Sequence, residues 1–384
     1  MTPSPPPVLA LGFRPFFLLA GLLASLWLPI WLLNLHGLWI LHGALQGPAW
    51  HAHEMLFGFV AAVLAGFLLT AVRNWTGQPT PSGWTLAGLA VLWLLARLLN
   101  LWGGALPQAL AIAVDVAFLP AVGAALTVPI LRAKNVRNFA FPPLLLLMGG
   151  ANLLSHLGIT LGTTPEQIAL DLVIVIVALI TGRIVPMFTQ NALKLETTKR
   201  PTLDKAVFAC LAGMLIFDRV PQAEAGRGLL SFVAGVLLAV RMVGWQSWQT
   251  RKLPILWVLH LGHAWLALGL MLRGVAIFAP DVVPMATATH ALTVGAIGTL
   301  ILGMMARVSL GHTGRPLVVN KVMAVAFALL ALAALVRTLV PMAAPELLLL
   351  GWTVAGVLWT AAFGLFVAVY APMLLAPRPD GKAG

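Results

Sequence analysis

Charged residues are scarce in this sequence. Asp, Glu, Lys and Arg make up 9% of its 384 residues, whereas soluble domains carry about 25%. Hydrophobic residues make up 60%, and the mean hydropathy is clearly positive. This composition excludes an ordinary soluble domain and predicts a membrane protein that crosses the bilayer many times.

Cysteine is nearly absent as well. Cys210 is the single cysteine, which excludes an internal disulfide and a cysteine-rich metal site. The proline-rich N-terminus, MTPSPPPVLALGFRPFF, lacks the basic segment and short apolar core of a cleavable signal peptide. No glycine-rich nucleotide loop, nucleophile triad or zinc signature is present. We therefore expect any chemistry at the histidines.

Long apolar stretches, separated by Pro, Gly or charged residues, predict twelve transmembrane helices. Their ranges are 16–34, 52–73, 83–101, 107–131, 140–161, 166–188, 203–218, 228–248, 254–278, 284–308, 317–339 and 346–374. The net charge of +12 comes from residues between these stretches and forms no dense patch for nucleic acid. Most Lys and Arg residues lie at the termini or after even-numbered spans, which predicts an inner-membrane protein with both termini in the cytoplasm.

The spans can be grouped into three sets of four. Spans 2, 6 and 10 end in the similar segments FLLTAVRNWTG, ITGRIVPMFTQN and MMARVSLGHTG. The chain would then be one transmembrane domain, 1–384, with internal repeats at 1–134, 135–252 and 253–384. Such repeats would give pseudo-threefold symmetry, as in the catalytic subunits of heme-copper oxidases. The alternative is that arginines simply collect at helix ends.

The segment WHAHEMLFGF, residues 50–59, places two histidines and Glu54 at the head of a long apolar run. At a rise of 1.5 Å per residue, His53, His156 and His290 lie roughly 30, 20 and 25 Å above the cytoplasmic ends of their helices. An ionisable group costs a few kcal/mol inside a bilayer and needs a partner or a function. Imidazole is a common ligand of metals and heme iron, and we favour cofactor ligation over plain hydrogen bonding for this group.

Other polar residues allow two interpretations each. His51 is two residues from His53, so both face one ion only if His51 precedes the first helical turn. Glu54 could orient an imidazole. His260 and His263 share a helix face at lower depth, where packing and ligation are equally plausible, and the outer-loop residues His36 and His42 are expected to be solvated.

Several charged residues lie inside or near the ends of spans. Arg97 and Arg273 either snorkel to the outer surface or pair with heme propionates, and Asp115 and Asp171 could relay protons. At the cytoplasmic face we predict a polar cluster, in which the His312 turn resembles an anion-binding or loop-locking corner. Its members are Arg73, Asn74, Arg183, Arg307, His312 and Arg315.

The segments WHAHEMLFGFVAAVLAGFLLTAVRNWTG, GRIVPMFTQNAL and HALTVGAIGTLILGMMARVSLGHTGRPL resemble the signature segments of the NnrS family. LGFRPFFLLAG and NLLSHLG also match, so the resemblance extends over the whole chain. It implies a bacterial inner-membrane protein that contains heme, of b type, and copper, and that takes part in the response to nitric oxide. The family's histidine pattern falls on His51, His53, His156, His260, His290 and His312, and His263 is less typical of it.

A heme-copper oxidase-type binuclear centre is not favoured, because the chain has no histidine in span 6 or 7 and no adjacent histidine pair. The leading hypothesis is a protein that binds, senses or removes nitric oxide or its iron adducts. If it is a redox enzyme, electrons would come from quinone or a periplasmic donor. The alternative is a secondary transporter that uses the histidines as a transit site for a metal or small anion.

Overall fold

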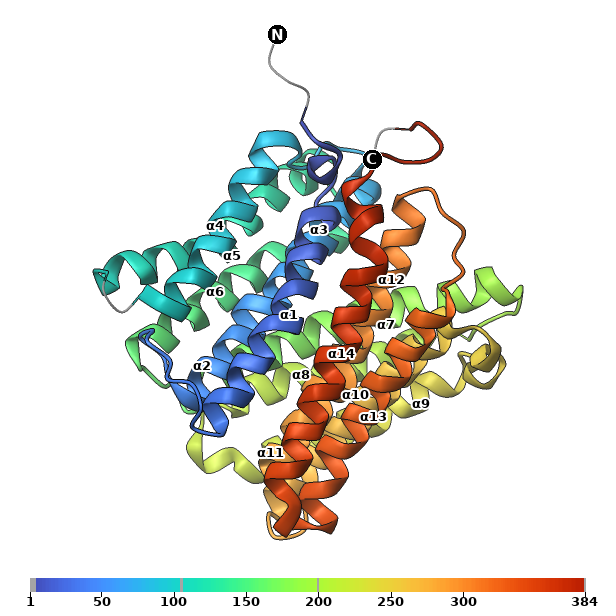
Figure 1. Ribbon diagram of the computed structural model, residues 1–384. Coiled ribbons are helices and arrows are strands. Elements are labelled where there is room, and N and C mark those ends of the chain that lie inside the picture. The colour runs from blue at the N-terminus through green and yellow to red at the C-terminus, as the bar shows by residue number, and fades with distance from the viewer. Residues whose placement is uncertain (1–4, 104–105, 199, 383–384) are drawn as a thin grey trace. The chain divides into compact units, whose positions relative to one another are not determined.

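The structure is a computed structural model that describes residues 5–103, 106–198 and 200–382 (Figure 1). The described residues form helices and no strands. The helices are α1 (Phe13–Leu35), α2 (Gly47–His53), η2 (Glu54–Val60), α3 (Ala61–Thr76), α4 (Gly83–Trp102), α5 (Gln108–Arg132), α6 (Phe141–Leu157), α7 (Pro165–Leu193), α8 (Pro201–Phe217), α9 (Glu224–Val243), α10 (Pro254–Phe278), α11 (Met285–His290), η7 (Ala291–Gly298), α12 (Thr299–His312), α13 (Lys321–Ala343) and α14 (Leu348–Leu375). Short 3₁₀ turns lie at Pro7–Leu9, Val136–Asn138, Pro221–Ala223, Ser247–Lys252 (η6) and Pro345–Leu347.

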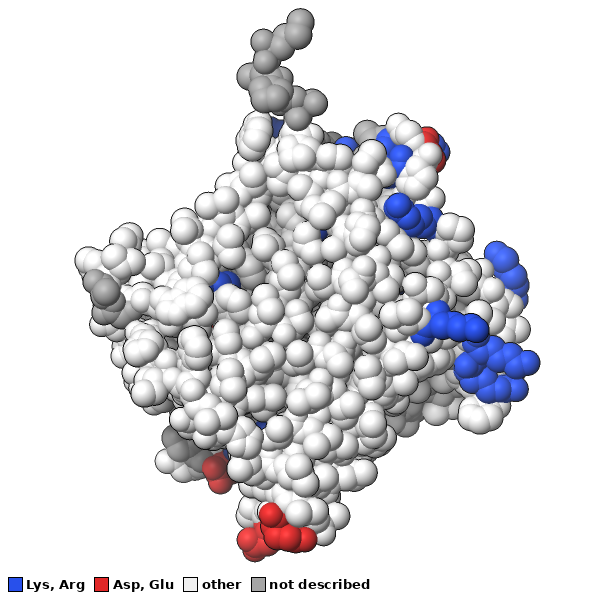
Figure 2. All heavy atoms as spheres, in the orientation of Figure 1, with Lys and Arg blue, Asp and Glu red and all other residues white. Residues whose placement is uncertain are grey.

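The helices have the length and composition of membrane spans. Within the described residues, eleven segments are long and apolar enough to cross a bilayer, which confirms the prediction of an all-helical polytopic membrane protein. The predicted span 203–218 corresponds to α8, whose 17 residues reach about 26 Å against a hydrocarbon core of about 30 Å. The face in Figure 2 carries few charged residues, as expected where helices meet lipid.

Local sequence signals explain many helix ends. Proline opens α2, α6, α8 and α10, where its missing N–H would be unpaired anyway. The Asn320 side chain caps α13 by accepting from the Met323 amide at 2.9 Å. Gly77 and Gly158 end α3 and α6 in the left-handed conformation.

Two membrane segments contain a π-helix that the sequence analysis did not predict. In the first segment, η2 begins directly after His53, and in the second, η7 begins directly after His290. A π-helix widens the turn by one residue and is frequent at functional sites. Two of the predicted repeat units thus share a π-helix that directly follows a histidine. The threefold repeat itself stays a prediction.

The chain divides into two compact units. Unit 1 contains residues 1–172, 308–317 and 363–384, and unit 2 contains 173–307 and 318–362. In unit 1, α1 packs against α3, and α5 packs against α3, α4 and α6. In unit 2, α9 packs against α8 and α10, while η7 packs against α10 and α13.

Candidate metal centre

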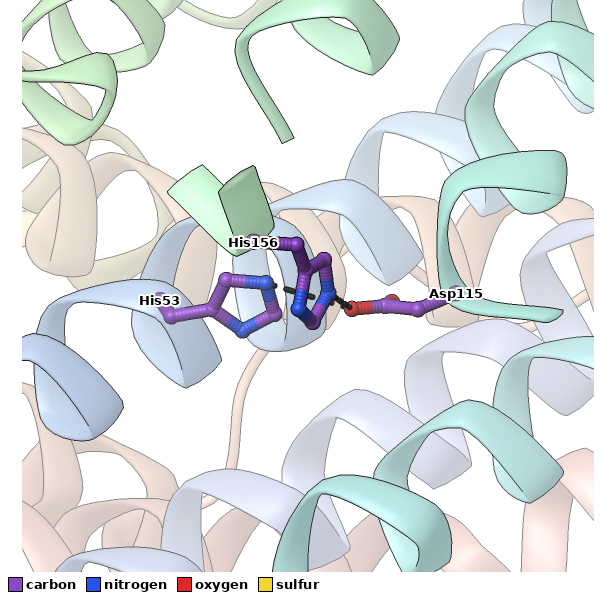
Figure 3. Close-up of side chains that lie close together, drawn as sticks. All are labelled: His53, Asp115 and His156. Carbon is purple, nitrogen blue, oxygen red and sulfur yellow. Dashed lines mark hydrogen bonds and ion pairs between the residues drawn. The ribbon is translucent and has the colours of Figure 1, made fainter. Parts of the chain in front are cut away.

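Unit 1 contains a buried cluster of two histidines and a carboxylate. His53 ends α2, Asp115 lies on α5 and His156 lies on α6 (Figure 3). One potential ligand atom from each residue lies within 4.8 Å of the other two, and all three residues are buried. We call His53, Asp115 and His156 the triad.

Asp115 is the centre of the triad. Its Oδ2 atom lies 2.8 Å from Nε2 of His156 and 3.1 Å from Nε2 of His53. The same oxygen accepts a 2.9 Å hydrogen bond from the Asn100 amide. From the sequence, Asp115 is a candidate proton relay without an evident partner. The structure supplies its partners, among them Asn100, which no sequence pattern singles out.

Arg97 links the triad to a second buried carboxylate. Its guanidinium donates to Oδ1 of Asp115 and, at 2.6 Å, to Oε1 of Glu54. The same Glu54 oxygen lies 3.2 Å from Nδ1 of His53. Glu54 therefore orients the imidazole, as the sequence analysis proposed for it, and Arg97 is held by protein carboxylates.

Gly58 makes room for Arg97, because it has no side chain. Gly58 lies within η2, and a Cβ added there would lie 3.0 Å from the Arg97 Nη1 atom. The Trp93 indole N–H donates a 3.0 Å hydrogen bond to the Gly58 carbonyl. One turn of α4, from Trp93 to Arg97, is thus fixed against η2 by two contacts.

The charges of the carboxylates and the guanidinium in the cluster do not cancel. Two buried carboxylates, Glu54 and Asp115, face one buried guanidinium, Arg97. One negative charge is left, and burial of an uncompensated charge is costly. A proton on an imidazole or a bound cation would balance it.

Three buried polar atoms of the cluster have no hydrogen-bond partner among the described residues. They are Oε2 of Glu54, Nε of Arg97 and Nδ1 of His156. Nε2 of His53 also lies 2.8 Å from Oδ1 of Asn152, so an ion that bound this nitrogen would replace that contact. The site therefore offers nitrogen and oxygen atoms as metal ligands, and some of these atoms make no hydrogen bond.

His51 lies apart from the triad. It is inside α2, two residues before His53, and its ring stacks on Trp31 at a centroid distance of 4.8 Å. The structure thus places the two histidines on different faces of one helix. His51 and His53 could share an ion only if His51 preceded the first helical turn, but α2 begins at Gly47 and His51 lies inside it.

The other predicted ligands lie in unit 2 and have hydrogen-bond partners there. His290 Nδ1 lies 2.6 Å from the Ala286 carbonyl, and its Nε2 accepts from Arg337 at 3.0 Å. His260 contacts Thr189 and Ser247 through its two ring nitrogens at 2.8 and 2.9 Å. His263 contacts Thr181 at 3.2 Å and packs against Trp245.

The arginines predicted to bind a cofactor or to join the cytoplasmic cluster also contact protein groups in unit 2. Arg273 lies 3.4 Å from Asp218, and the Arg307 guanidinium lies 3.8 Å above the Phe188 ring. Arg183 lies on α7, half-buried in unit 2. In unit 1, Asp171 accepts from Gln167 at 3.1 Å.

The remaining predicted cytoplasmic residues lie in unit 1. Arg73 and Asn74 are exposed at the end of α3. The His312 ring packs on Phe13 at 5.6 Å and its carbonyl accepts from Arg378 at 3.0 Å. Arg315 donates to the Thr313 carbonyl at 3.4 Å. These contacts fasten the turn after α12.

The fold and the site define a polytopic helical membrane protein with a buried histidine–carboxylate centre. Residues 7–378 match the protein family described as NnrS protein. The chain belongs to the NnrS family, whose members are metal-binding membrane proteins of the nitric oxide response. No curated protein matches the chain.

Proposed function

We propose that this protein is a heme- and copper-binding protein of the bacterial inner membrane that binds nitric oxide, and that the triad holds the copper ion. The buried, unbalanced charge around His53, Asp115 and His156 supports this assignment most directly. The excess of Lys and Arg residues after even-numbered spans supports a cytoplasmic position for both termini.

The triad has the donor set and spacing of a metal site. Ligands that lie about 2 Å from one ion are about 3 Å from each other at angles near 90–109°. The Oδ2 of Asp115 lies 2.8 and 3.1 Å from the two imidazole nitrogens. Imidazole and carboxylate together suit copper and zinc, and membership of the family favours copper.

The surrounding residues would hold and tune the ion. Glu54 fixes the ring of His53, while Arg97 and Asn100 fix the carboxylate of Asp115. Phe57 packs against the His53 ring at 5.0 Å and keeps water from that side. A bound copper ion supplies a coordination position for nitric oxide and can exchange one electron.

A heme has no equally direct place among the described histidines. Iron at His290 would have to replace the Arg337 guanidinium, and iron at His260 would have to replace a Ser247 or Thr189 hydroxyl. We therefore assign residues to copper only. Heme content remains part of the proposal because of the family resemblance.

The metal content of the purified protein tests this assignment. Wild type, His53→Ala and His156→Ala would be purified in detergent from copper- and heme-replete cells, and copper, zinc and iron measured by mass spectrometry. The matched control is His42→Ala, since His42 is exposed in the outer loop. Helical content and elution volume verify that each variant is folded.

We expect close to one copper per chain in the wild type and His42→Ala, and little copper in the two triad variants. Addition of nitric oxide should change the electron paramagnetic resonance signal of the copper-loaded proteins only. Full copper content in a folded triad variant would refute the assignment, and so would stoichiometric zinc in its place. Catalysed loss of nitric oxide would distinguish an enzyme from a binding protein.

A further inference from the structure

A groove of about 460 Å³ lies in unit 2 between α9, the η6 turn and α10. Its apolar walls come from two membrane-spanning helices: Ala239, Met242 and Val243 of α9, and Ala264, Ala267 and Met271 of α10. Alanines leave the space open, and methionines adapt to a flat ring. The groove is therefore an apolar slot along the surface of the helix pair.

One end of the groove is polar. It is lined there by Gln246, Ser247 and Gln249, beside the exposed Trp248. Gln246 has a positive φ of 57°, which a residue with a side chain adopts at some cost and which is frequent at functional sites. This bend lies between the end of α9 at Val243 and the start of η6 at Ser247, and Ser247 contacts both the groove and His260.

Ser247 begins a chain of hydrogen bonds that leads away from the groove. The Thr189 hydroxyl donates to the Val185 carbonyl at 2.9 Å, so it accepts from Nε2–H of His260 at 2.8 Å. In a neutral imidazole Nδ1 is then an acceptor, and the Ser247 hydroxyl donates to it at 2.9 Å. The Ser247 hydroxyl therefore already donates its proton to His260, and its oxygen can accept a hydrogen bond from the groove side.

We infer that this groove binds the hydroxylated ring of a membrane quinol, with one quinol hydroxyl donating to Ser247. The apolar walls fit a substituted ring, and the accepting oxygen at the polar end fits a hydroxyl donor. A phospholipid headgroup fits less well, because no lining residue carries a positive charge that would pair with its phosphate. The inference does not depend on the proposed metal centre, because it concerns binding only.

The direction of the hydrogen bond gives a sharp test. The protein would be reconstituted in lipid nanodiscs, and binding of decylubiquinol followed anaerobically by the saturable change in tryptophan fluorescence. The comparison ligand is the dimethyl ether of the same quinol, which has the same ring and tail but no hydroxyl donor. We expect the quinol to bind roughly five- to tenfold more tightly, as one hydrogen bond predicts.

Two variants and two controls complete the test. Ser247→Ala should abolish the preference for the quinol over the ether, and Ala264→Leu, which fills the groove, should weaken both ligands by about tenfold or more. Ser25→Ala on α1 and Ala328→Leu, an exposed alanine of α13, should bind as wild type. Equal affinity for quinol and ether in the wild type, a preference that survives in Ser247→Ala, or no saturable binding would each overturn the inference.

Discussion

His156 and Asp115 are 41 residues apart in the chain, and their Nε2 and Oδ2 atoms lie 2.8 Å apart in the core of unit 1. This contact joins α6 to α5, while Arg97 joins α5 to α4 through the same carboxylate. Asp115, on α5, thus contacts residues of three other segments, which are α4, α6 and, through His53, α2. Its charge should matter for stability as well as for metal binding.

The first prediction concerns that charge. Asp115→Asn keeps the size of the side chain but leaves the buried Arg97 with Glu54 as its one carboxylate. Breaking a buried ion pair on one side costs about 3–5 kcal/mol, so the thermal midpoint of the metal-free protein should fall clearly. Asp380→Asn breaks an exposed ion pair with Arg378 and should change stability by no more than about 1 kcal/mol. Equal midpoints for the two variants would contradict the role of Asp115.

The second prediction uses the shared guanidinium. Glu54, Asp115 and Arg97 together carry one negative charge, and the double variant Glu54→Gln with Arg97→Met carries the same. Arg97→Met alone leaves two buried carboxylates facing each other without their cation, which should cost about 3–5 kcal/mol. The double variant should therefore be more stable than the sum of the two single-variant losses predicts. Thermal unfolding of the wild type, the two single variants and the double variant measures this coupling. Strict additivity would show that Glu54 and Arg97 do not interact.

The third prediction separates two glycines that the sequence does not distinguish. A Cβ at Gly58 would lie 3.0 Å from Arg97 Nη1 and 3.1 Å from Leu23 Cδ2, whereas a Cβ at Gly88 meets nothing within 4 Å. Gly58→Ala should destabilise by about 1–3 kcal/mol and lower the copper content. Gly88→Ala should stabilise by about 0.5–1 kcal/mol, because alanine favours a helix. The opposite order in thermal unfolding would show that Arg97 moves freely.

The sequence predicted the helical membrane fold because its signals are long and repetitive. Counting depth along the helices placed His53 and His156 in the outer half, and the structure brings their rings to 5.0 Å. Depth alone does not give the rotation of a helix. His51, two residues away, therefore lies against Trp31.

The partners of Asp115 were harder to foresee. They depend on how α4, α5 and α6 pack, and contacts across 15 to 41 residues leave no local pattern. One signal was available: Arg97 lies near the end of α4 and Asp115 near the start of α5, so a short connection places opposite charges at similar depth. The π-helices left no signal, since one wider turn hardly changes an apolar pattern.

The last prediction concerns the other fully buried arginine of unit 1. Arg14, at the start of α1, donates to the carbonyls of Leu374 and Ala376 at 2.9 and 2.7 Å. The last carbonyls of a helix have no partner within it, and a cation also interacts favourably with that end. Arg14 therefore closes the end of α14 and ties the first long helix to the last.

Arg14→Ala should leave these carbonyls buried and unpaired, at a cost of about 3 kcal/mol for two hydrogen bonds to a charged donor. Hydrogen exchange at residues 370–376 should become faster than in wild type, since the helix end can then open locally. The control is Arg132→Ala at the exposed end of α5, which removes a similar charge at a helix end and should cost no more than about 1 kcal/mol. Equal losses in both variants would mean that the charge at the helix end, and not the buried hydrogen bonds, is what Arg14 contributes.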